Sequence, residues 1–146
     1  LGTLGSISLL NKKNIKNLMV TNCDVLLDLN LKKFLKFHLE KDNDLSMVVV
    51  NKNIKIPYGV CRIEKDNLKN IEEKPNINFK INAGMYLMKD TVFKFFKNSK
   101  KVDFDKFYQL IRKKNYKIGV YLVSNSRWKD TGTFNSLEAT LKRTEF

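Results

Sequence analysis

Short apolar runs and one amphipathic segment alternate along the first third of the chain. Leu18 to Asn22 is an apolar run that ends in polar residues, which predicts a buried strand with Asp24 at its carboxyl end. Residues 31–39 carry apolar side chains at mainly helical spacing, with lysines between them, and predict an amphipathic helix. Residues 45–50 are a second apolar run. Because a strand, a helix and a strand in this order favour a parallel right-handed crossover, we predict an open α/β sheet.

The rest of the chain predicts further strands and helices. Four segments have the apolar content or alternation of strands: residues 58–63, 68–71, 81–88 and 117–123. The first two flank the polar segment Lys65-Asp66-Asn67 and predict a hairpin. Three segments have the pattern of a helix behind a capping residue, and their caps are Asp90, Asp103 and Thr133. The six Phe residues at 34, 37, 93, 96, 104 and 107 are spaced like the core face of helices.

Length and composition indicate one cytoplasmic domain. A chain of 146 residues with 42% hydrophobic content can bury one core, so we expect residues 1–146 to be a portion of a single domain. No apolar run reaches the roughly 20 residues that cross a bilayer, and residues 1–10 lack the features of a signal peptide, so we expect no membrane partner. Cys23 and Cys61 have no metal-binding spacing and are expected to be free thiols.

The formal net charge of +13 raises the question of a nucleic-acid partner. The composition argues against one, because Lys outnumbers Arg by 24 to 4 and Arg is the residue favoured for bidentate phosphate and guanine contacts. Abundant Lys, Asn, Ile and Phe together are typical of a protein from an AT-rich genome. We therefore expect no nucleic-acid partner.

Two acidic residues follow apolar strands and are candidate metal ligands. Asp24 and Asp130 are far apart in the sequence, yet both fall at strand ends that can meet at one edge of an α/β sheet. Mg²⁺ commonly takes one or two carboxylates and completes its coordination with water and substrate phosphates. The alternative is structural: Asp24 begins a turn, and Asp130 belongs to a polar loop before a helix.

The tripeptide Glu73-Lys74-Pro75 places a carboxylate beside a cation. Pro75 biases Lys74 toward an extended conformation, so that the two adjacent side chains diverge. Carboxylates pair with sugar hydroxyls and ammonium groups pair with phosphate, so the tripeptide could hold both parts of a sugar phosphate. An exposed loop with an ordinary pair of charges is the alternative.

Two glycine-containing segments lie within or at the start of predicted strands. Gly59 and Gly84 indicate a bulge or the close approach of a ligand or another backbone. Asn82 adds an amide that can both donate to and accept from a sugar hydroxyl. Each segment is equally consistent with a packing role.

Taken together, these segments resemble the sugar-1-phosphate nucleotidyltransferase family. The resemblance spans essentially the whole chain and rests on six motifs: Leu-Gly-Thr-Leu-Gly from residue 1, Thr-Asn-Cys-Asp from 21, Pro-Tyr-Gly-Val from 57, Glu-Glu-Lys-Pro from 72, Ile-Asn-Ala-Gly-Met-Tyr from 81, and Trp-Lys-Asp-Thr-Gly-Thr from 128. The first motif is similar to that of mannose-1-phosphate guanylyltransferases. The resemblance implies a Rossmann-like α/β fold with a mixed, mainly parallel open sheet flanked by helices.

The resemblance also implies roles for individual residues. Asp24 and Asp130 would correspond to the magnesium-binding aspartates, and Lys74 would bind the phosphate of a sugar 1-phosphate. The residues that would bind or approach the sugar are Gly59, Glu73, Asn82 and Gly84, and those that would lie near the nucleotide are Gly2 and Thr3. The implied reaction moves a nucleoside monophosphate from a nucleoside triphosphate, with GTP slightly favoured, to a sugar 1-phosphate and releases pyrophosphate. A homo-oligomer is left open.

Two departures from the family pattern affect this interpretation. Cys23 stands where Gly is frequent, and the family's Gly-rich triphosphate loop is absent from the sequence. We therefore expect a fold that is incomplete at the amino terminus and a chain that is inactive by itself. The alternatives are an inactive sensing or scaffold domain and a basic nucleic-acid-binding domain. The presence of both Asp24 and Asp130 argues against a sensing domain.

Overall fold

A four-stranded mixed sheet lies at the centre of the fold in the computed structural model, which describes residues 2–97, 101–132 and 138. The strand order is β1 (Asn17–Thr21), β6 (Asn76–Lys89), β3 (Leu45–Lys55) and β7 (Ile118–Ser124). β6 is antiparallel to both of its neighbours, whereas β3 and β7 are parallel. β1, β3 and β7 therefore run in one direction and β6 in the other, which confirms the predicted α/β fold with a mixed sheet.

The predicted crossover from β1 to β3 differs from expectation in two respects. The strands do run in the same direction, but β6 lies between them, so they are not paired with each other. β1 is an edge strand whose residues alternate between half-buried and exposed, and it is not the buried strand that its apolar run predicts.

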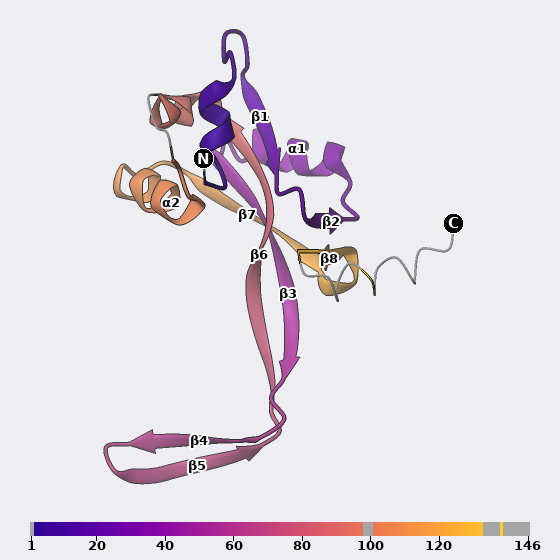
Figure 1. Cartoon of the computed structure of the whole chain (residues 1–146), viewed down its shortest axis with the longest axis vertical. Helices are drawn as coiled ribbons and strands as arrows, with labels where there is room; N and C mark the ends of the chain where they lie inside the picture. Colours follow the sequence, from indigo (N-terminus) through magenta and orange to yellow (C-terminus); the bar gives the residue numbers. More distant parts are fainter. Residues whose placement is uncertain (1, 98–100, 133–137, 139–146) are drawn as a thin grey trace.

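Helices cover both faces of the sheet (Figure 1). Helix α1 (Leu31–Glu40) begins behind Asn30, whose side chain accepts a hydrogen bond from the Lys33 N–H at 3.0 Å. It buries Phe34 in a cluster with Val48, Val50, Ala83 and Leu87. The opposite face carries α2 (Phe104–Lys113) and the 3₁₀ helices η1 (Gly5–Leu9) and η2 (Asp90–Phe96) around a second cluster.

The predicted aromatic core is largely confirmed. The phenylalanines that are buried are Phe34, Phe93, Phe96 and Phe107, while Phe37 and Phe104 are half-buried against the same clusters. No helix within the described ranges is long and apolar enough to span a membrane.

The helix caps were predicted less well. Asp103 does occupy the residue before α2, but its side chain makes no capping hydrogen bond, and the Thr3 hydroxyl accepts from the Phe104 N–H instead, at 3.2 Å. Asp90 is the first residue of η2, so Lys89 is the residue that precedes it. Thr133, the predicted cap of the last helix, lies outside the described residues.

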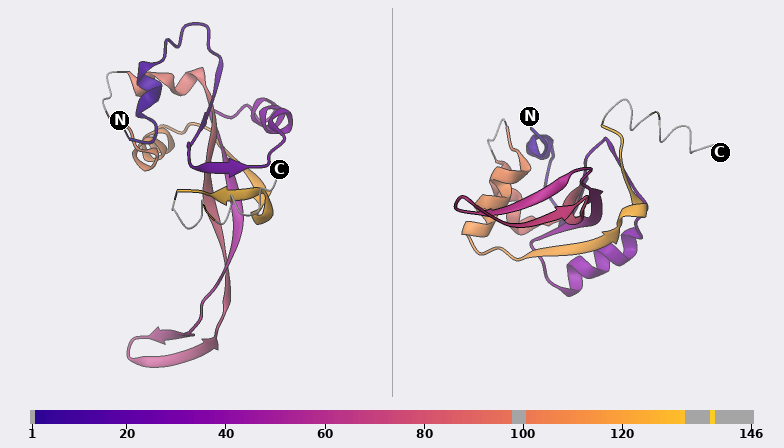
Figure 2. Two further views of the ribbon diagram at one scale, coloured as in Figure 1. Left: turned by 45° about the vertical axis from the view of Figure 1, so that its right-hand side comes forward. Right: turned by 90° about the horizontal axis from the view of Figure 1, so that it is seen from below.

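Two small ribbons complete the fold. β2 (Val25–Leu27) pairs with β8 (Trp128–Asp130), and a short 3₁₀ helix, η3 (Asn125–Arg127), precedes β8. The predicted hairpin forms from β4 (Gly59–Glu64) and β5 (Asn67–Glu73), with its turn at Lys65 and Asp66. Figure 1 and the left view of Figure 2 show this hairpin, hereafter the arm, at the far end of the long β3–β6 ribbon.

Candidate functional site

The ribbon of β2 and β8 brings Asp24 and Asp130 together. Val25 pairs with Asp130 in the ribbon, so Asp24 lies directly beyond the pairing. Thr131 fixes the Asp24 backbone, because its N–H and its hydroxyl both donate to the Asp24 carbonyl, at 2.8 and 3.0 Å. The Gly132 N–H donates to Asp130 Oδ1 at 2.8 Å and orients that carboxylate.

Gly132 shows how close the two carboxylates lie. A Cβ atom on Gly132 would stand 3.0 Å from Asp24 Oδ2 and 3.1 Å from Asp130 Oδ1. Both oxygens therefore border one small space, which a side chain at residue 132 would fill. Both aspartates are exposed, so this space is open to solvent and to a ligand.

The donor set at this position fits a magnesium ion that arrives with a phosphate ligand. The described part of the chain contains no group of three His, Cys, Asp or Glu side chains that could hold a metal ion by themselves. Mg²⁺ does not need such a group, because one or two carboxylates suffice when substrate phosphates and water supply the other ligands.

Gly84 lies beside Asn22, two residues before Asp24 in the sequence. The Asn22 N–H donates to the Gly84 carbonyl at 2.8 Å, which connects the segment before Asp24 to β6. Gly84 has a positive φ of 77°, and a Cβ there would lie 3.0 Å from Asn22 Nδ2. The predicted close approach at Gly84 is therefore an approach of Asn22.

The Asn82 amide is engaged within its own strand. Its Oδ1 accepts from the Gly84 N–H at 3.0 Å, and its Nδ2 donates to the Tyr86 hydroxyl at 2.7 Å. Burial raises the pKa of Tyr86, so this hydroxyl is protonated at neutral pH. The amide predicted to bind sugar hydroxyls thus already has partners, which a sugar would have to share or replace.

Trp128 anchors the ribbon to the central sheet, and its role was not predicted. Its indole N–H donates to the Ala83 carbonyl at 3.2 Å, and the Lys52 ammonium lies 5.0 Å from the ring centroid. Through these contacts Asp130 is held near the Asn82 segment. Thr131 and Gly132 were missed as individual residues too, although the motif from Trp128 contains all three.

The arm carries the other predicted acceptor residues. Gly59 is paired with Glu73 across the two strands, and Glu73 Oε2 lies 3.0 Å from where a Gly59 Cβ would be. The absence of a side chain at Gly59 therefore makes room for the Glu73 carboxylate.

The predicted conformation of Lys74 is wrong. Lys74 has a positive φ of 47°, not an extended backbone, and its ammonium lies 4.0 Å from Glu73 Oε1, so the two side chains do not diverge. The reason is that the chain leaves β5 at this residue, where the Lys74 N–H donates to the Tyr58 carbonyl at 3.2 Å. Closing the base of the arm outweighs the preference that Pro75 imposes.

The structure does not bring the arm residues to the carboxylate pair. The strand from Asn76 to Asn82 separates the base of the arm from Asn82 by about 20 Å at the usual rise per residue. Figure 1 and the left view of Figure 2 show the arm well apart from β8. The expected pocket of Gly59, Glu73, Lys74 and Asn82 is therefore present as two separate parts.

Gly2 and Thr3 contact the residues at which α2 begins. Gly2 has a positive φ of 70° and is packed against Val102 and Asp103, where a side chain would clash. Thr3 accepts from the Phe104 N–H, and the Phe104 ring stacks on Tyr86 at a centroid distance of 4.4 Å. This segment is thereby connected through Tyr86 to Asn82.

Solved structures from two bacteria share this fold. HddC from Yersinia pseudotuberculosis superposes on 99% of this chain with a TM-score of 0.69 and 23% sequence identity, and the chain covers 63% of HddC. A complex of HddC with GMP-PN has a TM-score of 0.68 and 22% identity, and the chain covers 63% of that protein too. A putative glucose-1-phosphate thymidylyltransferase from Bacillus anthracis, in complex with a sucrose, superposes on 98% of the chain at 19% identity and a TM-score of 0.65, and 60% of it is covered. These similarities define the fold.

The sequence comparisons then establish the family. The nucleotidyl transferase family model matches residues 3–145, so the chain belongs to that family, in agreement with the resemblance noted from its motifs. Mannose-1-phosphate guanylyltransferase 1 of Arabidopsis thaliana is 32% identical over 100 residues, which are 63% of this chain and 28% of that protein. The catalytic subunit beta of the Danio rerio enzyme is 34% identical over 94 residues, 60% of this chain and 26% of that protein. The chain thus matches about a quarter of the length of these relatives.

Proposed function

We propose that this chain is the sugar-phosphate-binding portion of a sugar-1-phosphate nucleotidyltransferase domain. The complete enzyme transfers a nucleoside monophosphate from a nucleoside triphosphate to a sugar 1-phosphate and releases pyrophosphate. The observation that carries the proposal is the convergence of Asp24 and Asp130 over Gly132 in a chain of the nucleotidyl transferase family.

The chemistry asks the protein mainly for alignment and charge. The attacking group, a phosphate monoester, is already ionised near neutral pH, so the site needs no general base. Asp24 and Asp130 would hold Mg²⁺, which offsets the negative charge of the phosphates when it is bound. Lys74 would bind the phosphate of the acceptor through a charge-assisted contact, and Glu73 would accept hydrogen bonds from sugar hydroxyls.

A guanosine product is slightly favoured. The support is the Leu-Gly-Thr-Leu-Gly segment at the start of the chain and the mannose-1-phosphate guanylyltransferases among the similar proteins. We further propose that the enzyme is cytoplasmic and that this chain alone does not turn over, because the triphosphate loop of the family is not in the sequence.

The test is pyrophosphate release by the complete protein with a panel of nucleoside triphosphates and hexose 1-phosphates. We expect magnesium-dependent release, and a loss of at least about 100-fold in kcat/KM for Asp24→Asn and for Asp130→Asn. Asp28→Asn is the matched control, because Asp28 is exposed on the segment that follows β2 and has no proposed role.

Two results would count against the proposal. Unchanged turnover in both aspartate variants would show that the carboxylate pair is structural. Binding of a sugar 1-phosphate without any pyrophosphate release would favour the alternative of an inactive sensing or scaffold domain.

A further inference from the structure

Two exposed leucines lie at the end of the molecule opposite the arm. Leu9 is the last residue of η1, and Leu10 follows it. Leu9 is 74% exposed, more than any other large apolar side chain among the described residues, and Leu10 is 44% exposed. Figure 1 and the left view of Figure 2 show the connection from η1 to β1 protruding at the end farthest from the arm. An adjacent pair of this kind on a protruding segment is typical of an interaction site.

The protruding loop after the leucines is held by its own hydrogen bonds. Asn11 Oδ1 accepts from the Lys13 N–H at 3.2 Å, and the Ile15 N–H donates to the Lys12 carbonyl at 3.3 Å. The Ile15 side chain then packs against the buried cluster that contains residues of η1 and η2. The loop is therefore a defined structure that presents its side chains in a fixed arrangement.

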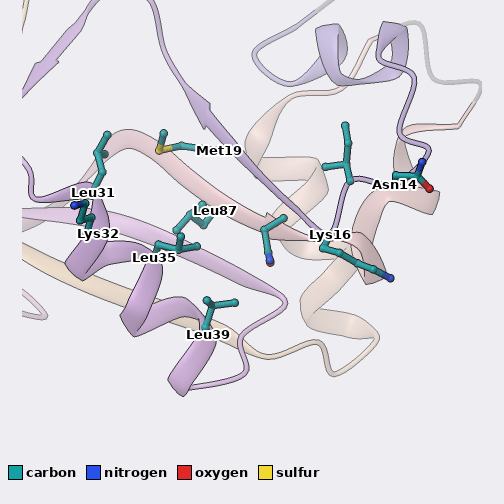
Figure 3. A pocket seen from close by; sticks show the side chains of 10 residues that line it. Asn14, Lys16, Met19, Leu31, Lys32, Leu35, Leu39 and Leu87 are labelled. Atoms are coloured by element: carbon teal, nitrogen blue, oxygen red, sulfur yellow. The ribbon is translucent and has the colours of Figure 1, made fainter.

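Lysines from two segments surround the leucines. Residues 1–20 contain three lysines and no acidic residue, and η2 with the residue after it adds two more. The two segments meet, because Leu10 and four of these lysines line one cavity of about 580 Å³. Figure 3 shows the Lys16 side chain extending away from helix α1. We call this surface the basic end, and its lysines are Lys12, Lys13, Lys16, Lys94 and Lys97.

Positive charge is concentrated at the basic end. Lys16 lies 3.5 Å from Asp90, but within the described ranges no ion pair involves the other four lysines. The arm region differs, because residues 56–75 contain four basic and four acidic residues. The basic end therefore carries more positive charge than the opposite end of the molecule.

Exposed leucines among unpaired lysines match the chemistry of an anionic lipid surface. We propose that the basic end binds membranes that contain anionic lipids, with Leu9 and Leu10 inserted among the acyl chains and the lysines on the lipid phosphates. Apolar side chains gain by leaving water for the acyl region, and each lysine close to an anionic surface adds to the attraction. Nucleic acid fits less well, because it offers the leucines no apolar layer and the basic end has no Arg for base contacts.

This inference goes beyond the proposed function and does not depend on it. The sequence argument against a membrane partner concerned spanning segments and signal peptides, and binding to a membrane surface requires neither. Figure 1 shows β8, which carries Asp130, away from the protruding loop. A protein attached by its basic end therefore keeps the carboxylate pair open to solvent.

Sedimentation of the complete protein with lipid vesicles tests the inference. Vesicles of phosphatidylcholine alone are compared with vesicles that also contain about one third phosphatidylserine. We expect binding to the anionic vesicles to be at least about tenfold tighter, and to weaken at least about fivefold when NaCl is raised from about 0.1 to 0.5 M, because salt screens the attraction.

Two lysine variants with the same loss of charge locate the binding surface. The first neutralises the basic end and should weaken binding to anionic vesicles at least about tenfold; its changes are Lys13→Gln, Lys94→Gln and Lys97→Gln. The control neutralises lysines at the opposite end and should change binding less than about twofold, because those lysines lie beyond the screening length from the lipid; its changes are Lys55→Gln, Lys65→Gln and Lys69→Gln.

A leucine variant tests insertion separately from charge. Replacing Leu9 and Leu10 by Ser should weaken binding at least about fivefold, because the net charge is kept and apolar burial is lost. Leu122→Ser is the control, because Leu122 is 56% exposed but lies on β7. An unchanged thermal unfolding midpoint in each variant shows that the fold persists.

Four outcomes would overturn the inference. Equal binding to both kinds of vesicle, or binding to neither, would mean that anionic lipid is not the partner. Equal weakening in both lysine variants would assign the binding to net charge alone. Unchanged binding in the leucine variant would exclude insertion, and displacement of the vesicles by a DNA duplex at lower concentration than by free lipid would assign the basic end to nucleic acid. Pyrophosphate release by a protein that does not bind vesicles would contradict this inference and leave the proposed function intact.

Discussion

The body of the molecule and its arm hold their candidate residues by different means. The body, with the central sheet and its helices, contains the buried clusters, and Trp128 attaches the ribbon of Asp24 and Asp130 to it. The arm, β4 and β5, has no buried residue, and its ladder of backbone hydrogen bonds is its main support. A two-stranded hairpin with both faces in water is marginally stable by itself. The carboxylate pair is therefore positioned by packing, and the residues predicted to bind the acceptor are positioned by the local pairing of two strands.

The exposed ion pairs of the arm do not change this comparison. Lys69 lies 3.2 Å from Glu64, and Lys74 lies 4.0 Å from Glu73, but all four side chains are more than half exposed. Surface pairs of this kind contribute between zero and about 1 kcal/mol. The arm thus depends on its attachment to the β3–β6 ribbon, where the Ile56 N–H donates to the Pro75 carbonyl at 2.9 Å.

The largest expected difference between the two regions is in stability. Phe34→Ala removes a fully buried ring from the cluster beneath α1 and should lower the free energy of unfolding by about 3 to 5 kcal/mol. Ile63→Ala on the arm is the control, and because Ile63 is 68% exposed it should cost less than about 0.5 kcal/mol. Urea denaturation of both variants measures the contrast. Equal losses of unfolding free energy in the two variants would mean that Ile63 of the arm is buried in solution.

A second difference is expected in substrate use. Lys74→Ala in the complete enzyme should weaken the apparent affinity for the sugar 1-phosphate by about 1.5 to 3 kcal/mol, through loss of a charge-assisted contact, and leave nucleotide binding nearly unchanged. Lys69→Ala, on the same arm, is the matched control. Steady-state kinetics and titration calorimetry separate the two substrates. An unchanged KM for the sugar phosphate would show that Lys74 does not bind this substrate.

The sequence predicted the local elements of both regions well. Helical spacing predicted a helix over residues 31–39, and α1 ends one residue later, at Glu40. The polar segment at Lys65 correctly predicted the turn of the arm. The reason is that amphipathic periodicity and turn residues are read from neighbours along the chain. The burial of the first strand was overestimated, because an apolar run does not say whether a strand lies at the edge of a sheet.

Long-range features were predicted only in part. That Asp24 and Asp130 could meet at a sheet edge was predicted from strand ends, but β2 and β8 are three-residue strands whose pairing has no local signal. The sequence left open whether the segment of Asn82 packs or binds a ligand. The structure shows that the Asn82 amide donates to the Tyr86 hydroxyl, a contact within the same strand that the sequence does not reveal. The positive φ of Lys74 depends on closure against Tyr58, which a rule about the residue before Pro does not include.

A smaller effect is expected from pH, and it belongs to the body. His38 is buried, with Nδ1 2.8 Å from the Ser46 hydroxyl and Nε2 3.2 Å from Asn17 Oδ1. Burial is the main cause that lowers the pKa of His38 below 6.5, with Lys89 adding to it, while Asp44 and Asp42 oppose the shift. A neutral imidazole therefore stabilises the fold.

The sign of the pH effect follows from this lowered pKa. Stability from His38 is fully present above the unfolded pKa of about 6.5 and is lost as pH falls below it toward the folded value. Urea denaturation between pH 7.5 and 5 should show a slope of at most about 1.4 kcal/mol per pH unit. His38→Gln should lack this slope, because the chain has one His and the carboxyl groups titrate mainly below this range. The same slope in the variant would assign the effect to other groups.

The smallest effect on stability is expected from removing the arm altogether. Lys55 and Asn76 are paired at the end of the β3–β6 ribbon, so residues 56–75 can be replaced by Asn-Gly, which closes two paired strands with a two-residue turn. The body should lose about 1 kcal/mol or less, because the replacement removes no member of either buried cluster. Thermal unfolding followed by near-UV circular dichroism of Trp128 reports on the ribbon that carries Asp130, and its signal should be unchanged. A large fall in Tm, or loss of the Trp128 signal, would show that the arm supports the carboxylate pair. In the complete enzyme the same replacement should abolish use of the sugar phosphate while nucleotide binding persists, because it removes Lys74 and Glu73 and leaves Asp24 and Asp130 in place.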